Sequence, residues 1–355
     1  LTIESLTIEE TRYPLEAESS FDCSDPRLAA AAAPMIRCLQ MCTHETYMDC
    51  PYYEQLMYAG DTRTEALATF VVSRDDRMPH KALRMFDASR HTTGLEISAS
   101  RYPSETTQII PPFSLWWVAM VHDFALWRGD RTLLKSLMPG VRAVMDAFDN
   151  WRGADGLLNA PPGWNFVDWT QNWGAWDRMT APVAGVPPKA DREPSGILNW
   201  QLVYTLTRVA ELEQWLDEPE RAARCQRGAR ELAALSDKAF WDETRGLYAD
   251  DLGHAFFSEH AQCLALLSGM VPPERKARIG RALINDPDIE RATIYFMHYL
   301  FEAFQSLRMP EETLRRLDLW FGLQAQGFRT TPETPEPARS DCHAWGAHPL
   351  YHYHA

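Results

Sequence analysis

The sequence carries no surplus of positive charge. Lys and Arg together number 35, against 49 Asp and Glu, and the formal net charge is −14. Nucleic acids and anionic membrane surfaces bind basic proteins, so we expect neither as a partner. Long apolar runs are also missing, because none approaches the roughly 20 residues that a membrane-spanning helix needs.

Several motifs of known chemistry are missing as well. The chain has no GxGxxG, GxxxxGK[ST] or GxSxG motif. These motifs are the signatures of dinucleotide-binding sites, P-loops and α/β-hydrolases, so the sequence indicates none of these three classes. No CxxC pair occurs among the seven Cys, and their odd number argues against a disulfide framework or a zinc ribbon. Cys38 and Cys42 stand four residues apart in a predicted helix and are expected to be buried thiols. Reduced thiols and the lack of a signal peptide favour a cytoplasmic protein.

Aromatic residues are abundant. The chain has 355 residues, of which 45% are apolar and 24% charged, so it can bury a full core. It also has 13 Trp, and several of them stand in sequence without helical periodicity. Stacking on a sugar ring is one use of a Trp that is not part of the core.

Apolar residues at intervals of three and four predict an all-α chain of eleven or twelve helices. We expect helices at about 26–43, 62–74, 81–89, 113–128, 131–151, 194–216, 218–241, 256–269, 273–284, 294–307 and 311–323, with a last short one near Ala344. Asp25 and Asp130 are predicted to cap the helices that follow them, and Pro26 to occupy a first helical position. Six helical hairpins closed into an (α/α)6 toroid fit this count, while an α-solenoid or an irregular bundle stays open.

The first residues differ from the rest. LTIESLTIEE alternates apolar and polar residues as an edge strand does, and then the pattern breaks. We therefore expect residues 1–24 to be a linker or strand from an upstream β-domain, and residues 25–355 to be one helical domain. On this interpretation the chain is a fragment of a longer protein.

The loop between the first two predicted helices carries an unusual set of side chains. Residues 44–63 contain three acids, Asp49, Glu54 and Asp61, among four Tyr. Carboxyls that transfer protons, beside flat apolar rings, are what a sugar-cleaving site needs. A carboxyl enclosed by aromatic rings has its neutral form favoured, which suits a general acid. Asp61 precedes a helical pattern and is also predicted to be an N-cap.

Two further stretches carry candidate site residues. Glu333 stands in proline-rich, extended sequence, and His343 with Trp345 follows it as a pair suited to bind a polyol. Residues 153–192 have no helical period and hold Trp164, Asp168 and Trp169, which either pack locally or form a sugar platform. Histidines also stand at positions 343, 348, 352 and 354, but no acid or Cys at ligand spacing completes a metal motif, so we expect neither metal nor cofactor.

Two segments together resemble a known family. DCPYYEQLMYAGDTR (49–63) and ETPEPARSDCHAW (333–345) are similar to signature segments of the glycoside hydrolase family 78 α-L-rhamnosidases. The resemblance implies an (α/α)6 catalytic domain that follows β-sandwich domains, which are missing from this chain. Many members of the family have Arg where this chain has Tyr53, so one expected contact to the sugar or to a carboxylate is in doubt.

The resemblance also implies roles for individual residues. Glu54 would be the general acid and Glu333 the general base of an inverting hydrolase that acts on rhamnosides. Such pairs stand roughly 6.5–9.5 Å apart, and in a closed toroid the two ends of the chain can meet at that distance. The resemblance and the loops together give the expected substrate-binding set: Asp49, Asp61, Tyr53, Trp164, Asp168, Trp169, His343 and Trp345.

Three other interpretations remain open at this stage. The domain could be another (α/α)6 glycosidase, a polysaccharide lyase on the same toroid, or a catalytically idle carbohydrate-binding domain. A lyase would leave an unsaturated sugar, so analysis of the products separates it from a hydrolase.

Overall fold

The computed structural model describes residues 3–93, 95, 98, 101, 102, 109–174 and 184–354. Helices dominate this part of the chain. In the first half they are α1 (Pro26–Met41), α2 (Ala59–Val72), α3 (Arg77–Thr93), α4 (Pro111–Arg128) and α5 (Arg131–Asn150). In the second half they are α6 (Gly196–Trp215), α7 (Pro219–Phe240), α8 (Glu259–Leu267), α9 (Pro273–Asn285), α10 (Met297–Ser306), α11 (Pro310–Arg316), α12 (Asp318–Leu323), the 3₁₀ turn η2 (Ala344–Ala347) and α13 (Pro349–His352).

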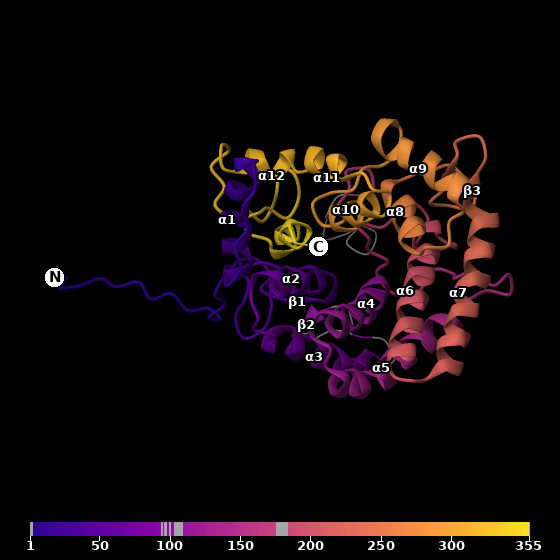
Figure 1. The fold of residues 1–355 in the computed structure, drawn as a ribbon, viewed down its shortest axis with the longest axis horizontal. Helices are drawn as coiled ribbons and strands as arrows, with labels where there is room; N and C mark the ends of the chain where they lie inside the picture. The colour runs from indigo at the N-terminus through magenta and orange to yellow at the C-terminus, as the bar shows by residue number, and fades with distance from the viewer. Residues whose placement is uncertain are drawn as a thin grey trace.

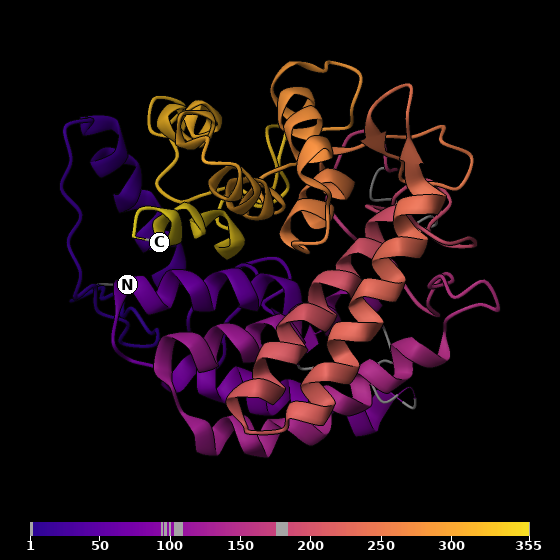
Figure 2. The ribbon, with the colours of Figure 1, turned by 45° about the vertical axis from the view of Figure 1, so that its right-hand side comes forward.

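The helices form two concentric layers. In the inner layer α2 contacts α4, α4 contacts α6, α6 contacts α8, and α8 contacts α10. The inner ring then closes, because His298 of α10 is hydrogen-bonded to His352 of α13 at 3.0 Å, and α13 with η2 contacts α2. Helices α1, α3, α5, α7, α9 and α11–α12 lie outside this ring (Figures 1 and 2). The predicted (α/α)6 toroid is confirmed, and the open solenoid is wrong.

Sequence pattern explains which helices lie inside. The helix α4 is buried from Pro111 to Phe124, as expected of a helix that is apolar on all sides. Every residue of α2 is buried as well, although its first half carries Asp61, Arg63 and Glu65. The outer helices α5, α7 and α9 instead bury one stripe and expose charged residues on the other face. No helix in the described ranges is long and apolar enough to cross a bilayer.

Helix caps decide several of the boundaries. The Asp25 carboxylate accepts from the backbone N–H of Arg27, with Pro26 as the first residue of α1, and Asp130 accepts from Thr132 and Leu133 at the start of α5. These predicted caps are confirmed. The predicted cap at Asp61 is wrong, because α2 begins two residues earlier, at Ala59, and Asp61 lies within its first turn. The helix expected at 311–323 is divided into α11 and α12.

The first residues do not form the expected strand. Residues 3–24 contain neither helix nor strand, and Ile3, Leu6 and Ile8 are exposed, since no strand lies beside them to complete a ladder. Figure 1 shows the beginning of this segment running away from the ring, whereas Leu15 is buried and the Tyr13 N–H donates to the Thr43 carbonyl at 2.9 Å. The strands in the described part of the chain form two short antiparallel pairs, β1 (Met57–Tyr58) with β2 (Arg101–Tyr102), and β3 (Trp241–Asp242) with β4 (Leu247–Tyr248).

Candidate functional site

A pocket lies where the beginning of α2 meets the C-terminal segment. Its lining combines carboxylates with aromatic rings: Asp49, Glu54, Tyr58, Asp61, Ile110, Phe113, Trp164, Phe166, Trp169, Glu333, Arg339, His343 and Trp345. Every residue of the predicted site except Tyr53 and Asp168 is therefore in one place. A larger hollow of about 380 Å³ between α5, α6 and α7 contains none of them.

The two segments that carry the acids are held together by the backbone. Ala344 donates its N–H to the carbonyl oxygen of Asp49 at 2.9 Å. Glu333 donates its N–H to Ser340 at 2.9 Å, and its carbonyl accepts the indole N–H of Trp345 at 2.8 Å. Residues 333–345 thus form a loop closed on itself and joined to residue 49. This join places Glu333 in the same pocket as Glu54.

Arg339 lies between the two candidate catalytic acids. Its Nη2 donates to Glu54 Oε1 at 2.5 Å and to Glu333 Oε1 at 3.3 Å. Because one nitrogen contacts both, the nearest oxygens of the two carboxylates are at most about 6 Å apart with Arg339 between them, which is shorter than the roughly 6.5–9.5 Å of inverting pairs. Burial lowers the pKa of Arg339, but the two carboxylates outweigh it and raise that pKa above its usual range.

The turn that carries Glu54 has an unusual backbone. Gln55 has a φ of 58°, in the left-handed region that residues other than Gly seldom adopt. The Glu54 N–H donates to the sulfur of Cys50 at 3.4 Å, which fastens the turn to the buried residue next to Asp49. The Glu54 side chain remains about one fifth exposed, so it can reach both the pocket and solvent.

A second charged group lies deeper in the pocket. His343 Nε2 is 3.1 Å from Asp61 Oδ1, and both side chains are 3% exposed. Burial raises the pKa of Asp61 to about 6. Burial lowers the pKa of His343, but its hydrogen bond to Asp61, together with the charges of Glu333, Asp61 and Asp49, raises it to about 9. Between these values the pair is an ion pair, and the other ring nitrogen of His343 has no hydrogen-bond partner among the described residues.

Asp49 is fixed next to this pair. Its Oδ1 accepts the N–H of Leu56 at 2.8 Å, and its Oδ2 accepts the thiol of Cys50 at 3.0 Å. Burial raises the pKa of Asp49 above its usual range, while His343 opposes that shift. The floor of the pocket therefore holds two carboxylates around one histidine.

Aromatic rings form the remaining walls. Trp345 stacks on Tyr295 with ring centroids 4.8 Å apart and lies 4.3 Å from the His343 ring. On the other side Phe166 contacts Phe113 at 5.7 Å, Trp164 at 5.3 Å and Trp169 at 4.8 Å. Apolar rings opposite carboxylates suit a sugar, whose faces are apolar and whose edges carry hydroxyls.

Asp168 does not reach the pocket. Its carboxylate accepts from the backbone N–H of Thr293 at 2.7 Å, from the Thr293 hydroxyl at 2.5 Å and from His260 Nε2 at 2.8 Å. This fully buried set anchors the loop that carries Trp169, so Asp168 supports the wall instead of touching a ligand. Trp176 and Asp177, which also belong to this Trp-rich stretch, lie outside the described residues.

The tyrosines of the acidic loop are arranged differently from the prediction. Tyr52 and Tyr53 are 79% and 56% exposed, so they do not enclose Glu54 as expected. They pack edge to face on each other instead, and Tyr53 lies 5.9 Å from the Arg339 guanidinium, at the mouth of the pocket. Tyr58 is the tyrosine of this loop that lines the pocket.

Sequence reasoning missed five lining residues: Tyr58, Ile110, Phe113, Phe166 and Arg339. The aromatic and aliphatic ones look like core residues in a one-dimensional pattern. Arg339 stands inside the second signature segment, but nothing in the sequence shows that it contacts both acids. Of the four C-terminal histidines, His343 lines the pocket. His348 and His352 lie with His298 away from the pocket, where His298 and His348 are buried and His352 is half-buried.

The closed ring and its acid-lined, aromatic-walled pocket define a six-hairpin domain of the glycosidase type. Residues 16–296 match the sequence model of the bacterial alpha-L-rhamnosidase 6 hairpin glycosidase domain. The chain therefore belongs to this family. Among curated proteins, no sequence matches the chain at a significant level.

Solved structures agree on the fold. The family 78 rhamnosidase of Bacillus sp. GL1 is 24% identical with a TM-score of 0.86, over 96% of this chain and 36% of that one. A Klebsiella oxytoca rhamnosidase with rhamnose bound is 21% identical with a TM-score of 0.82, over 94% and 65%. The Streptomyces avermitilis α-L-rhamnosidase complexed with L-rhamnose is 15% identical, with a TM-score of 0.72, over 94% and 32%. This chain thus spans between 32% and 65% of the length of these proteins.

Proposed function

We propose that this chain is the catalytic domain of an inverting glycosidase that releases terminal α-L-rhamnose from rhamnosides. The observation that carries the proposal is the position of Glu54 and Glu333, which lie in one pocket on either side of Arg339. Membership of a rhamnosidase domain family and the rhamnose-bound neighbours support the choice of sugar.

In the proposed reaction the two acids act on opposite sides of the sugar ring. Glu54 protonates the glycosidic oxygen as the bond breaks, and Glu333 removes a proton from the attacking water. Glu54 suits the acid role because it is at the mouth, where an aglycone would extend into solvent. Glu333 is almost fully buried and suits the role of holding one water.

The floor of the pocket would bind the sugar hydroxyls. Asp49 and Asp61 offer carboxylate oxygens as acceptors, and protonated His343 offers a donor at its unpartnered ring nitrogen. Trp345 and the cluster of Trp164, Phe166 and Trp169 would cover the ring faces and the apolar methyl group of a 6-deoxy sugar. These contacts select a sugar that combines hydroxyls with an apolar edge.

Arg339 must move before this reaction can occur. The free volume of the pocket is about 40 Å³. Since a single water needs about 10–15 Å³ of such volume, the space holds a few waters and no sugar ring. The Arg339 side chain is 38% exposed, so it can turn outward and leave room for the sugar and the attacking water.

Product analysis with a panel of aryl glycosides tests the proposal. We expect hydrolysis of the α-L-rhamnoside in preference to other sugars, and proton NMR should show the β anomer as the first product. A first-formed α anomer would contradict inversion, and an unsaturated product would indicate a lyase. The Glu333→Gln protein serves as the control for contaminating glycosidases, because it should leave the whole panel uncleaved.

A further inference from the structure

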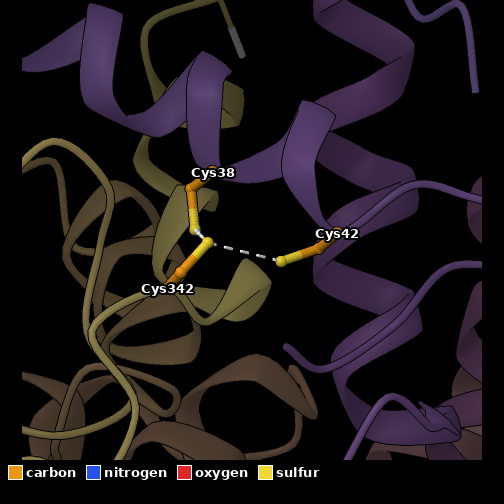
Figure 3. Close-up of side chains that lie close together, drawn as sticks. All are labelled: Cys38, Cys42 and Cys342. Atoms are coloured by element: carbon orange, nitrogen blue, oxygen red, sulfur yellow. Dashed lines mark hydrogen bonds between the residues drawn. The ribbon is translucent and has the colours of Figure 1, made fainter. Parts of the chain in front are cut away.

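Three cysteines from the two ends of the chain meet behind the pocket. Cys38 and Cys42 stand one turn apart at the end of α1, and Cys342 belongs to the C-terminal segment (Figure 3). The sulfur of Cys342 is 3.7 Å from that of Cys38 and 3.9 Å from that of Cys42. All three sulfur atoms lie within 4.8 Å of one another, and all three residues are free thiols.

These spacings match the coordination sphere of a thiolate-bound metal ion. With a Zn–S bond of about 2.3 Å, two sulfurs on one zinc stand about 3.8 Å apart in tetrahedral geometry and about 4.0 Å apart in trigonal geometry. The Cys342 sulfur stands at 3.7 Å and 3.9 Å from the other two, and the Cys38 and Cys42 sulfurs lie within 4.8 Å of each other. An ion could therefore bind all three sulfurs if those of Cys38 and Cys42 move by at most about 1 Å relative to each other.

The cluster can be reached from solvent through one of its members. Cys38 and Cys42 are buried, while Cys342 is half-buried. A cation can therefore approach the three sulfurs from the side of Cys342.

We propose that Cys38, Cys42 and Cys342 form a structural site for a thiophilic metal ion, of which Zn²⁺ is the representative. Three metal–sulfur bonds would form, and the three thiol protons would leave to solvent. A water, or the carbonyl oxygen of Thr331, which is 3.7 Å from the Cys38 sulfur, would complete four ligands. The ion would have no part in the chemistry, since none of the three cysteines lines the pocket.

Such an ion would join the two segments that carry the proposed catalytic acids. Cys342 precedes His343 and follows Arg339 by three residues, and the Cys42 sulfur is 3.8 Å from the carbonyl oxygen of Asp49. Binding would therefore hold α1, residue 49 and the loop of Glu333 as one unit. Its expected effect is higher stability of the closed ring, independent of which sugar the pocket accepts.

Metal binding to the reduced chain tests the site. Zn²⁺ is titrated against a chromophoric chelator, and Cd²⁺ is used as a second probe through its sulfur-to-metal charge-transfer absorption. We expect one ion per chain and a rise in melting temperature on binding. Cys342→Ser should weaken binding by at least roughly ten-fold, because it removes a charged ligand. Cys263→Ser, which alters a buried thiol of α8 outside the cluster, should bind as the wild type does.

A second measurement uses only the wild-type chain and remains decisive if a variant fails to fold. Zn²⁺ should protect Cys342 from alkylation by iodoacetamide, as read by peptide mass spectrometry, while leaving the exposed Cys23 reactive. Alkylation of Cys342 at the same rate with and without Zn²⁺ would overturn the proposal. So would a Cys38–Cys342 disulfide that forms even with Zn²⁺ in excess, because the cluster would then be a redox pair.

Discussion

The pocket contains two pairs of carboxylates, and each pair shares one cation. At the mouth, Glu54 and Glu333 share Arg339, which is 38% exposed. On the floor, Asp49 and Asp61 surround His343, which is buried and bonded to Asp61 at 3.1 Å. Arginine keeps its charge at all ordinary pH values, whereas histidine can lose its charge. Arg339 at the mouth can therefore move but keeps its charge. His343 on the floor is held in place but can lose its charge.

On the proposed mechanism, this difference separates the chemistry at the mouth from the binding of hydroxyls on the floor. Two acids that exchange protons with a substrate need a cation that can withdraw from between them, and a long exposed side chain allows that. Two acids that orient hydroxyls need a fixed partner, and the buried His343–Asp61 contact provides it. Each pair can be disrupted on its own, and the predictions below run from the largest expected effect to the smallest.

Removing either acid at the mouth should have the largest effect. We expect Glu54→Gln and Glu333→Gln each to lower kcat for an aryl α-L-rhamnoside with a poor leaving group by at least roughly 100-fold, the scale of lost general acid–base catalysis. Glu336→Gln changes an exposed acid of the same loop and should leave kcat unchanged. Near wild-type activity in either main variant would remove that residue from the mechanism.

Removing the cation of the floor should affect both binding and stability. His343→Gln leaves the buried carboxylate of Asp61 without its ionic partner, and loss of one partner of a buried pair costs about 3–5 kcal/mol. Part of that cost is avoided because Asp61 can take up a proton. We expect a lower free energy of unfolding in urea and a raised KM. An unchanged KM would show that the floor does not touch the sugar.

The floor should also set the pH dependence. The pKa of His343 is raised from 6.5 to about 9 on folding, so its stabilisation is complete below pH 6.5 and disappears as pH rises through 9. The pKa of Asp61 is raised from 3.8 to about 6, so the cost of ionising it in the folded protein appears as pH rises from 3.8 to about 6 and is constant above that. The fall in melting temperature from pH 6.5 to about pH 9 should therefore come from His343. His343→Gln should flatten the upper part of this curve, and a wild-type curve that is level there would contradict the assigned ionisation.

Removing the cation of the mouth should have the smallest effect on stability. Arg339 is partly exposed and its ion pairs are screened by solvent, so Arg339→Ala should change the free energy of unfolding by less than about 1 kcal/mol. Because the guanidinium fills the space between the acids, we expect substrate to bind at least as tightly. Arg329→Ala, another exposed arginine of this segment, serves as the control. A large rise in KM would show instead that Arg339 binds the sugar.

Much of the architecture follows from local pattern. Apolar runs such as α4, amphipathic ones such as α5, and caps such as Asp130 are predictable because each depends on neighbours within a few residues. The start of α2 at Ala59 is not predictable in this way, because no side chain caps this helix. Residues 3–24 form no strand within this chain, since a strand depends on a partner that the alternation of residues does not reveal, and their origin in an upstream β-domain stays a prediction.

The sequence predicts most of the residues that line the pocket, but it predicts their contacts less well. Two signature segments identify Glu54 and Glu333 as partners, and ring closure brings them together. Asp168 shows the limit of that reasoning. An acid among tryptophans suggests a contact with a ligand, but in the structure Thr293 and His260 donate hydrogen bonds to its carboxylate oxygens. Arg339 shows the converse, since a charge in a proline-rich loop gives no sign of the distant acid that it contacts.

The contact between α13 and α2 that closes the ring has a consequence for how the protein is made. Synthesis from the N-terminus delivers Glu54 before Glu333. A nascent chain therefore holds the proposed general acid without its base until α13 docks on α2. On the proposed mechanism, hydrolytic activity switches on as the ring is completed, so a chain released from the ribosome before Glu333 would be inert.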